Sequence, residues 1–269
     1  MFRVLFIGDV VGAPGLAALR SRLKALVARY GASYCIVNAD NLAEGGRGLS
    51  RADVECLLAL GVDVITTGNH VWRDPEIHAF IEREKRLLRP LNLRQASAGQ
   101  GLYRRPHPEL SAPICTLQLS GRVFMNDADC PFLAADQVLA DKSEGEVVIV
   151  DFHAEATSEK VALGWYLDGR VSAVVGTHTH VQTADERILP GGTAYITDTG
   201  MTGPHDSVLG FDKEIIIPRF VHDKRQRFRV AQNDVRICGV VIDIDPATTR
   251  AHRIIRFAEC LDDEIESKH

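Results

Sequence analysis

Apolar runs that end in a glycine or a polar residue alternate with stretches of helical periodicity near the N-terminus. The apolar runs predict strands at Phe2–Ile7, Tyr34–Val37 and Val62–Thr66. After the first run, Pro14 opens a segment whose apolar residues recur at a period near 3.6, and Gly31 is placed to end that helix. Ser50 is suited to begin a second helix before the third strand. This order of strands and helices favours parallel βαβ units.

The same alternation continues toward the C-terminus. It predicts helices at Ala134–Ala140 and Ser158–Leu167, and strands at Glu146–Asp151, Val171–Val175, Ala194–Thr197, Ile237–Ile244 and Ala251–Phe257. Pro113–Leu119 and Arg122–Met125 are typical of a hairpin that turns at Ser120-Gly121, whereas Leu87–Tyr103 has the pattern of irregular strand and loop. We therefore expect a single α/β domain over residues 1–269, built from mixed sheets.

Composition and charge narrow the class of protein. Of the 269 residues, 45% are apolar and 25% are charged, as in ordinary globular chains. The net charge of −5 gives no general basic footprint, so extended nucleic-acid binding is not expected. No apolar run is long enough to span a bilayer, and the N-terminus lacks the features of a signal peptide. We therefore expect a cytoplasmic protein without a membrane partner.

The cysteines point to structural thiols. Six cysteines are scattered along the chain, and none forms a Cys-x-x-Cys pair. We expect them to be reduced, with Cys35 and Cys56 in the core because both lie on apolar faces.

Residues able to bind a metal follow almost every strong strand. They are Asp9, Asp40 with Asn41, Asn69 with His70, His153, and His178 with His180. Ligands of open α/β sheets bind beyond the carboxyl ends of the strands, so these side chains are expected to converge. Carboxylate, carboxamide and imidazole groups together suit Mn, Fe or Zn. The candidates outnumber the ligands of one four-coordinate site, which favours two metals.

Each candidate also has a purely structural explanation. Asp9 and the Asn38–Asn41 segment could serve turns, Asn69 with His70 could be an ordinary loop pair, and a lone His153 is more often a satisfied histidine. His178 and His180 are more specific, because residues i and i+2 of an extended chain point to one side. The conjunction of all these positions favours a metal site. The remaining histidines show no such placement and are assigned to the surface or left uncertain: His78, His107, His205, His222, His252 and His269.

This ordered series resembles the calcineurin-like metallophosphoesterases. Within that superfamily, the segments GDVVG, TTGNHVW and GTHTHVQTAD resemble the YmdB-like bacterial phosphodiesterases, and the likeness runs from Gly8 past Asp198–Gly203. The resemblance implies an αββα sandwich, two metal ions (iron or manganese) and hydrolysis of phosphodiesters, including cyclic nucleotides.

The resemblance also implies roles for single residues. The first metal would be held by Asp9, Asn41 and His180, the second by Asn69, His153 and His178, with Asp40 as the bridging ligand. Through the two ions, a bridging water would become the nucleophile, and His70 would act on the leaving oxygen as general acid or electrostatic stabiliser.

Two positions depart from the patterns of the related proteins. Val11 stands where the broad superfamily has the histidine of Asp-x-His, a change that YmdB-like proteins share and that makes Asn41 the replacement ligand. Asp40 stands where YmdB-like proteins usually carry Glu. Aspartate is the bridging carboxylate of the broad superfamily, so the chemistry is expected to survive with a shorter arm.

The acidic net charge favours a small substrate such as a nucleoside 2′,3′- or 3′,5′-cyclic phosphate. Arg47 and Lys213 are either phosphate partners or solvated surface charge. Three other activities stay open: a low-turnover metal-binding signalling or scaffold protein, a phosphomonoesterase or nucleotidase, and an endoribonuclease, which the lack of a basic groove disfavours. A homo-oligomer is also left open.

Overall fold

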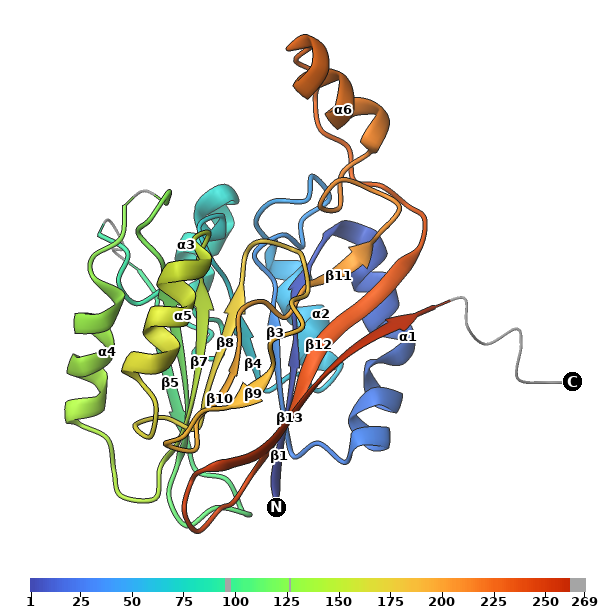
Figure 1. Ribbon diagram of the computed structural model, residues 1–269. Coiled ribbons are helices and arrows are strands. Elements are labelled where there is room, and N and C mark those ends of the chain that lie inside the picture. Colours follow the sequence, from blue (N-terminus) through green and yellow to red (C-terminus); the bar gives the residue numbers. More distant parts are fainter. Residues whose placement is uncertain (95–97, 126, 262–269) are drawn as a thin grey trace, which may run out of the picture.

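Two β-sheets lie face to face with helices on their outer sides in the computed structural model, which describes residues 1–94, 98–125 and 127–261 (Figure 1). The first sheet contains β1 (Phe2–Ile7), β2 (Asp9–Val10), β3 (Tyr34–Asn38), β4 (Val64–Thr66), β11 (Met201–Pro204), β12 (Val235–Ile244) and β13 (Ala251–Cys260). The second contains β5 (Leu102–Arg105), β6 (Ile114–Ser120), β7 (Val147–His153), β8 (Ala173–Thr177), β9 (Arg187–Ile188) and β10 (Ala194–Ile196). The helices are α1 (Gly12–Tyr30), α2 (Arg51–Ala59), η1 (Val71–Arg73), α3 (Pro75–Ile81), α4 (Pro131–Ala140), α5 (Thr157–Tyr166) and α6 (Lys213–His222).

Both sheets mix parallel and antiparallel pairs. The first has the order β2-β11-β12-β1-β3-β4, with β13 paired to β12, and its β1, β3 and β4 are parallel. The second has the order β5-β6-β7-β8-β10-β9, with a parallel centre and antiparallel strands at both edges. The predicted αββα sandwich of mixed sheets is confirmed.

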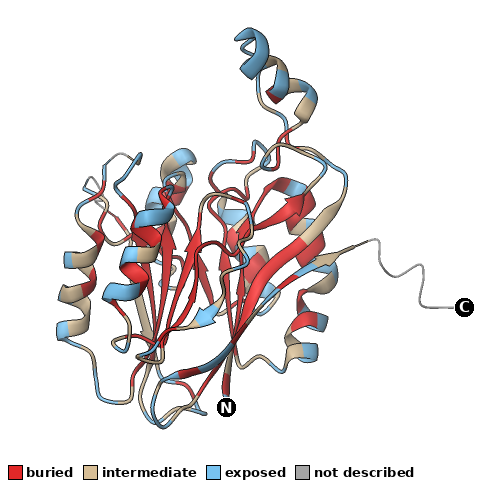
Figure 2. Cartoon of the chain, viewed as in Figure 1, coloured by how far each residue is buried: buried red, intermediate tan, exposed pale blue. Residues whose placement is uncertain are grey.

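Strand alternation explains the layers. Successive side chains of a strand point to opposite faces, so Val4 and Phe6 of β1 enter the apolar layer between the sheets, whereas Leu5 and Ile7 pack toward α1 and α2. A third apolar cluster lies between the second sheet and α4 with α5. Figure 2 shows the buried strands at the centre and the exposed outer faces of the helices.

Local capping signals set the ends of the early helices. Gly31 ends α1 with φ of 58°, a left-handed conformation that glycine adopts without strain, as the sequence predicted. Ser50 and Asp53 form a capping box at the start of α2. Cys35 is buried as expected, but Cys56 is only half-buried on α2, where its sulfur contacts Arg20. The prediction that Cys56 is a core residue is therefore wrong.

The predicted hairpin at Ser120-Gly121 is wrong. β6 pairs in parallel with β7 and antiparallel with β5, and residues 122–125 form no strand. The backbone N–H groups of Arg122 and Val123 instead donate to the Glu159 carboxylate on α5. These partners are more than 30 residues away, so local periodicity cannot indicate them.

Six short or irregular elements escaped the sequence pattern: β2, β9, β11, η1, α3 and α6. Of these, α6 projects from the body of the molecule, and its one buried side chain is Ile216 (Figure 1). Pro218 lies inside this helix, and its missing N–H weakens any helical prediction there. Across the described ranges, no helix combines the length and the apolarity needed to cross a membrane.

Candidate metal centre

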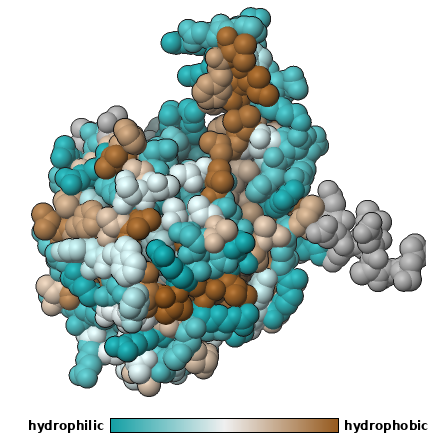
Figure 3. All heavy atoms as spheres, in the orientation of Figure 1, coloured by the Kyte–Doolittle hydropathy of each residue, from teal (hydrophilic) through white to brown (hydrophobic). Residues whose placement is uncertain are grey.

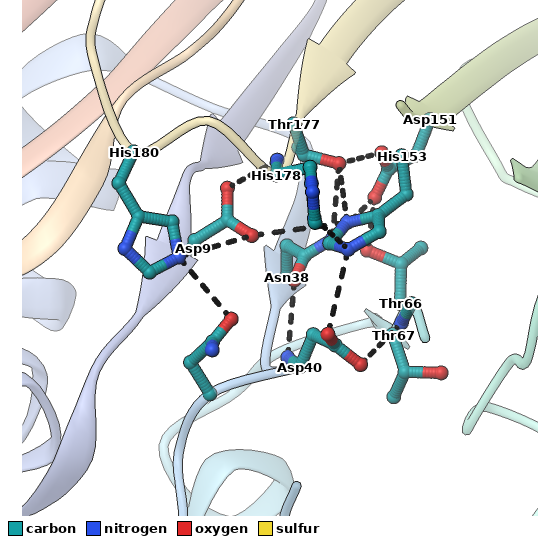
Figure 4. A network of polar contacts seen from close by, with 12 residues as sticks. Asp9, Asn38, Asp40, Thr66, Thr67, Asp151, His153, Thr177, His178 and His180 are labelled. Carbon is teal, nitrogen blue, oxygen red and sulfur yellow. Dashed lines mark hydrogen bonds and ion pairs between the residues drawn. The ribbon is translucent and has the colours of Figure 1, made fainter. Parts of the chain in front are cut away.

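Polar side chains from both sheets meet at the carboxyl edge of the sandwich (Figure 4). Asp9 follows β1, Asp40 and Asn41 follow β3, and Asn69 follows β4. His153 ends β7, while His178 and His180 follow β8. The structure therefore brings the predicted ligands together from five strand ends. Their donor atoms form two groups, which are described in turn.

The first donor group consists of Asp9 Oδ1, Asn41 Oδ1 and His180 Nε2. The His180 nitrogen lies 3.3 Å from the Asn41 oxygen and 4.0 Å from the Asp9 oxygen. Asn41 reaches this place because its backbone carbonyl accepts the Gly12 N–H at 3.0 Å and the residue pairs with Val11 in an isolated bridge. The backbone of Asn41 is thus fixed beside Val11.

The second donor group surrounds His153 Nε2. The Asn69 Oδ1 atom lies 3.1 Å from this nitrogen, His178 Nδ1 lies 3.0 Å away, and Asp40 Oδ2 lies 3.4 Å away. His153 is fully buried. Gly68 allows this packing, because a Cβ at that position would come within 2.2 Å of the His153 ring.

Hydrogen bonds to the outer nitrogens turn the lone pairs of His178 and His180 inward. His180 Nδ1 lies 3.0 Å from the Leu209 carbonyl, which can only accept, so Nδ1 carries the proton and Nε2 the lone pair. His178 Nε2 lies 3.1 Å from the Glu155 carboxylate, which assigns the lone pair to Nδ1. Burial next to His153 lowers the pKa of His178 to about 2, so its imidazole is neutral. Histidines that bind metals are commonly oriented in this way.

His153 is oriented by a buried relay that the sequence did not reveal. Its Nδ1 lies 3.0 Å from the Thr177 hydroxyl, and that hydroxyl donates its one proton to Asp151 Oδ1 at 2.7 Å. The hydroxyl therefore accepts from Nδ1, so the neutral ring has its lone pair on Nε2. Burial lowers the pKa of His153, but the carboxylates of Asp40 and Asp9 outweigh it and raise the pKa. Asp151 also accepts from Thr66 and Asn38, and burial raises its pKa to about 6. A carboxylate in the middle of an apolar strand was the available signal.

The chemistry of these donor atoms is suited to metal cations. Asp9 Oδ1 is buried without a hydrogen-bond partner, and burial raises the pKa of this carboxyl. Around His153 Nε2, the neighbouring atoms offer lone pairs with too few protons to satisfy them. Within the ranges described, no three His, Cys, Asp or Glu side chains are arranged as ligands around a common point. Their donor atoms instead contact one another. Cations would satisfy these oxygen and nitrogen atoms, and the two asparagines complete the set.

Asp40 sits with the second donor group. Its Oδ1 accepts the backbone N–H groups of Gly68 at 2.6 Å and His70 at 3.0 Å. Burial opposes ionisation, but His153 and the His70 contacts outweigh it, and the pKa of Asp40 is lowered. The carboxylate between the two groups is Asp9, whose Oδ1 lies 3.8 Å from His153 Nδ1 and 4.0 Å from His180 Nε2. The bridging role of Asp40 stays a prediction.

The predicted reason for the convergence of His178 and His180 is wrong. Both residues have positive φ, 97° and 64°, in the loop after β8, so they are not alternate residues of an extended chain. Their imidazoles turn to different donor groups on either side of Asp9 (Figure 4). The Asp198 carboxylate holds this loop by accepting the Thr179 N–H at 3.1 Å and its hydroxyl at 2.7 Å.

A pocket of about 220 Å³ opens onto the donors. It is lined by Asn41, Arg47, His70, Glu155, His178, Thr179, His180, Leu209 and Phe211. A larger pocket of about 650 Å³ near Arg104 contains none of the candidates, so the donor positions rather than pocket size identify the site. Of the two suggested phosphate partners, Arg47 lines the site pocket, whereas Lys213 pairs with Asp206 outside it.

Of the histidines that the sequence placed outside the site, His107 is buried, where it packs edge-on against Phe2. His78 stacks on Trp72. His269 lies outside the described residues.

Comparison with known proteins agrees with this geometry. The family model of YmdB-like protein matches residues 5–257. The 2′,3′-cyclic-nucleotide 2′-phosphodiesterase of Bacillus subtilis (strain 168) is 48% identical over 256 residues, covering 94% of this chain and 96% of the relative. A solved structure of a novel phosphatase from Mycoplasma pneumoniae is 36% identical with a TM-score of 0.90, covering 96% and 93% of the two chains. The NAD nucleotidase of Haemophilus influenzae shares the fold alone, with a TM-score of 0.61 at 11% identity over 96% of this chain and 56% of that one. This chain belongs to the family of YmdB-like proteins.

Proposed function

We propose that this chain is a metal-dependent phosphodiesterase whose substrates are nucleoside cyclic phosphates, the 2′,3′-cyclic form first among them. The observation that carries the proposal is the pair of donor groups, in which the histidines turn lone pairs inward and Asp9 Oδ1 is buried without a partner. The name of the Bacillus subtilis relative supports the choice of substrate.

The donor set suits two ions of iron or manganese, with zinc as a third candidate. One ion would be held by Asp9, Asn41 and His180, the other by Asn69, His153, His178 and Asp40, with Asp40 reaching the first ion if it bridges. When bound, such ions supply Lewis acidity that neutralises phosphoryl oxygens and lowers the pKa of water.

The side chains around the pocket would orient the diester and move the proton. In hydrolysis, the water oxygen bonds to phosphorus, one P–O bond to the ribose breaks, and the departing oxygen takes up a proton. His70 lines the pocket beside Asn69 and belongs to neither donor group, so it can donate an N–H to that oxygen. Burial lowers the pKa of His70, which favours a neutral hydrogen-bond donor over a charged acid. Arg47 would bind a phosphate oxygen.

Metal analysis combined with a substrate panel tests this function. We expect hydrolysis of adenosine 2′,3′-cyclic phosphate that a chelator abolishes and added Mn²⁺ restores. His180→Ala should lose metal and activity together, because it removes a ligand of the first group. His70→Ala should keep its metal and lose roughly 10²- to 10⁴-fold in kcat. His78→Ala, which removes an imidazole stacked on Trp72, is the matched control and should retain activity.

Several results would change the assignment. Full activity in metal-free protein would refute the two-metal account, and loss of metal in His70→Ala would move that residue into the ligand set. Absence of turnover with any metal favours the signalling or scaffold role. Faster hydrolysis of adenosine 5′-monophosphate than of the cyclic diesters favours a phosphomonoesterase.

A further inference from the structure

A series of aromatic rings and guanidinium groups leads out of the site pocket. It begins at Phe211, which lines the pocket. The Arg47 guanidinium lies 5.7 Å from the Phe211 ring centre and 5.0 Å from that of Phe228, and the two rings are 5.2 Å apart. Arg219 of α6 lies 5.1 Å from the same Phe228 ring. The contacts therefore run without a break from the metal-binding candidates to the projecting helix.

The outer end of this series is exposed on α6. Phe220 is 83% exposed, and Ile217 and Val221 lie in the open beside it. Figure 3 shows hydrophobic residues, in brown, on the part of the molecule that projects above its body. A large aromatic ring held this far from any core is available for stacking with a ligand.

Positive charge is concentrated on α6 and on the residues that follow it. Residues 213–229 carry six basic and two acidic side chains, a net +4, whereas the rest of the chain carries −9. Lys213 and Arg229 are paired with carboxylates of the adjoining segments. In the described part of the chain, no carboxylate pairs with the other basic residues of this surface, namely Arg47, Arg73, Arg219, Lys224, Arg225 and Arg227.

These observations define a ligand that is both polyanionic and rich in flat rings. Proteins bind single-stranded nucleic acid by a basic track along the phosphates and aromatic side chains on which bases stack. A mononucleotide would occupy the pocket and leave α6 unused. A membrane would use the exposed apolar residues of α6 but not the series that continues into the pocket. The expectation of a small substrate came from the net charge of the whole chain. That sum hides the separation between the basic segment 213–229 and the acidic remainder.

We infer that the substrate is single-stranded RNA whose 3′ end carries a 2′,3′-cyclic phosphate, with the cyclic phosphate in the site pocket and the preceding nucleotides along Phe228, Arg219 and Phe220. This inference rests on the proposed phosphodiesterase activity. Water adds to the terminal phosphorus, the bond from phosphorus to one ribose oxygen breaks, and that oxygen is protonated, so the RNA chain keeps its length and ends in a phosphomonoester.

The test compares adenosine 2′,3′-cyclic phosphate with a pentaadenylate that ends in the same cyclic phosphate. We expect kcat/KM at low salt to be at least about tenfold higher for the oligonucleotide, since stacking and phosphate contacts add to binding, and to fall as salt increases. Arg219→Gln/Phe220→Ser should reduce this advantage to about twofold or less and leave the mononucleotide rate unchanged. Arg187→Gln on β9 removes a similar arginine–aromatic contact, the one with Trp165 of α5, and this control should keep the advantage.

Each alternative outcome is distinguishable. Equal kcat/KM for the two substrates in the wild-type chain, or an advantage that survives in Arg219→Gln/Phe220→Ser, overturns the inference but leaves the phosphodiesterase intact. If neither substrate is hydrolysed, the proposed function fails, and fluorescence anisotropy with labelled pentaadenylate still decides whether these two residues bind RNA. Binding to phosphatidylglycerol vesicles that the double variant loses, with unchanged oligonucleotide kinetics, assigns the α6 surface to a membrane instead.

Discussion

A buried ion pair beneath the His178–His180 loop makes a quantitative prediction. Lys160 of α5 is 1% exposed, and its ammonium donates to the Thr177 carbonyl and to Asp198 Oδ2, both at 2.7 Å. Lys160→Met keeps the apolar stem but leaves the Asp198 charge without its cation. Breaking a buried pair on one side costs about 3–5 kcal/mol. Asp198 still accepts three other hydrogen bonds, so we expect about 3 kcal/mol.

Equilibrium unfolding in urea, followed by circular dichroism at pH 7 with a chelator present, measures this cost. Against a total stability of about 5–15 kcal/mol, the loss should shift the transition midpoint clearly. Lys142→Met is the matched control, because Lys142 donates to the Arg170 carbonyl and is expected to cost only about 0.5–1.5 kcal/mol. Metal content should fall in Lys160→Met, since the loop that carries His178 is anchored there.

A second variant isolates the cause. Lys160→Met/Asp198→Asn removes both charges and should recover at least half of the lost free energy, because no unpaired charge remains. If the double variant is as unstable as Lys160→Met, the loss comes from packing. If Lys160→Met costs no more than Lys142→Met, the ion pair does not contribute as argued.

Three further predictions concern the site wall, the outer loop and the thiols. Gly68→Ala should lose metal and activity, because the added Cβ would come within 2.2 Å of the His153 ring. The control is Gly45→Ala, whose Cβ would meet nothing within 4 Å, and it should behave as wild type in metal analysis and activity assays. Retained metal in Gly68→Ala would contradict the packing argument. Burial alone would raise the pKa of Asp185, but hydrogen bonds from Thr197 and Thr183 outweigh it and lower the pKa. The stability that the Asp185 carboxylate contributes is therefore present above its ordinary pKa of about 3.9 and is lost as pH falls through the lower folded value. Urea titrations should show that Asp185→Asn is less stable than wild type at pH 7 and about as stable in acid. Thiol titration of the native protein should modify the half-buried cysteines first and leave the buried ones, whose pKa burial raises, until the chain unfolds; equal rates would refute this. The half-buried set is Cys56, Cys130 and Cys260, and the buried set is Cys35, Cys115 and Cys238.

Much of the architecture could be predicted from local pattern. The strands β1, β3, β7 and β12 and the helices α1 and α2 follow from periodicity and capping residues, because burial of one face of an element is written into neighbouring positions. The metal-binding candidates could be found for the same reason, since each follows a strand whose end was recognisable. That residues 1–269 form a single domain stays a prediction.

The pairing of distant segments could not be predicted in this way. The pattern of β6 is equally typical of half of a hairpin, and its true partners, β5 and β7, are chosen by packing between layers. Asp151 looks like an interruption of an apolar strand until Thr66 and Thr177 are brought against it from other strands. Periodicity reports burial and is silent on the partner that satisfies a buried polar group.

The sequence by itself therefore determined which side chains stand at the strand ends and which family the chain resembles. Tertiary structure alone decided that His178 and His180 face different donor groups, that outer hydrogen bonds select their lone pairs, and that Arg47 meets the basic segment 213–229 at the Phe228 ring. The physical reason is the distance along the chain over which each effect acts. Burial and capping act between residues a few positions apart, whereas the orientation of a ring or the summed charge of a surface depends on atoms that only folding brings within a few ångströms.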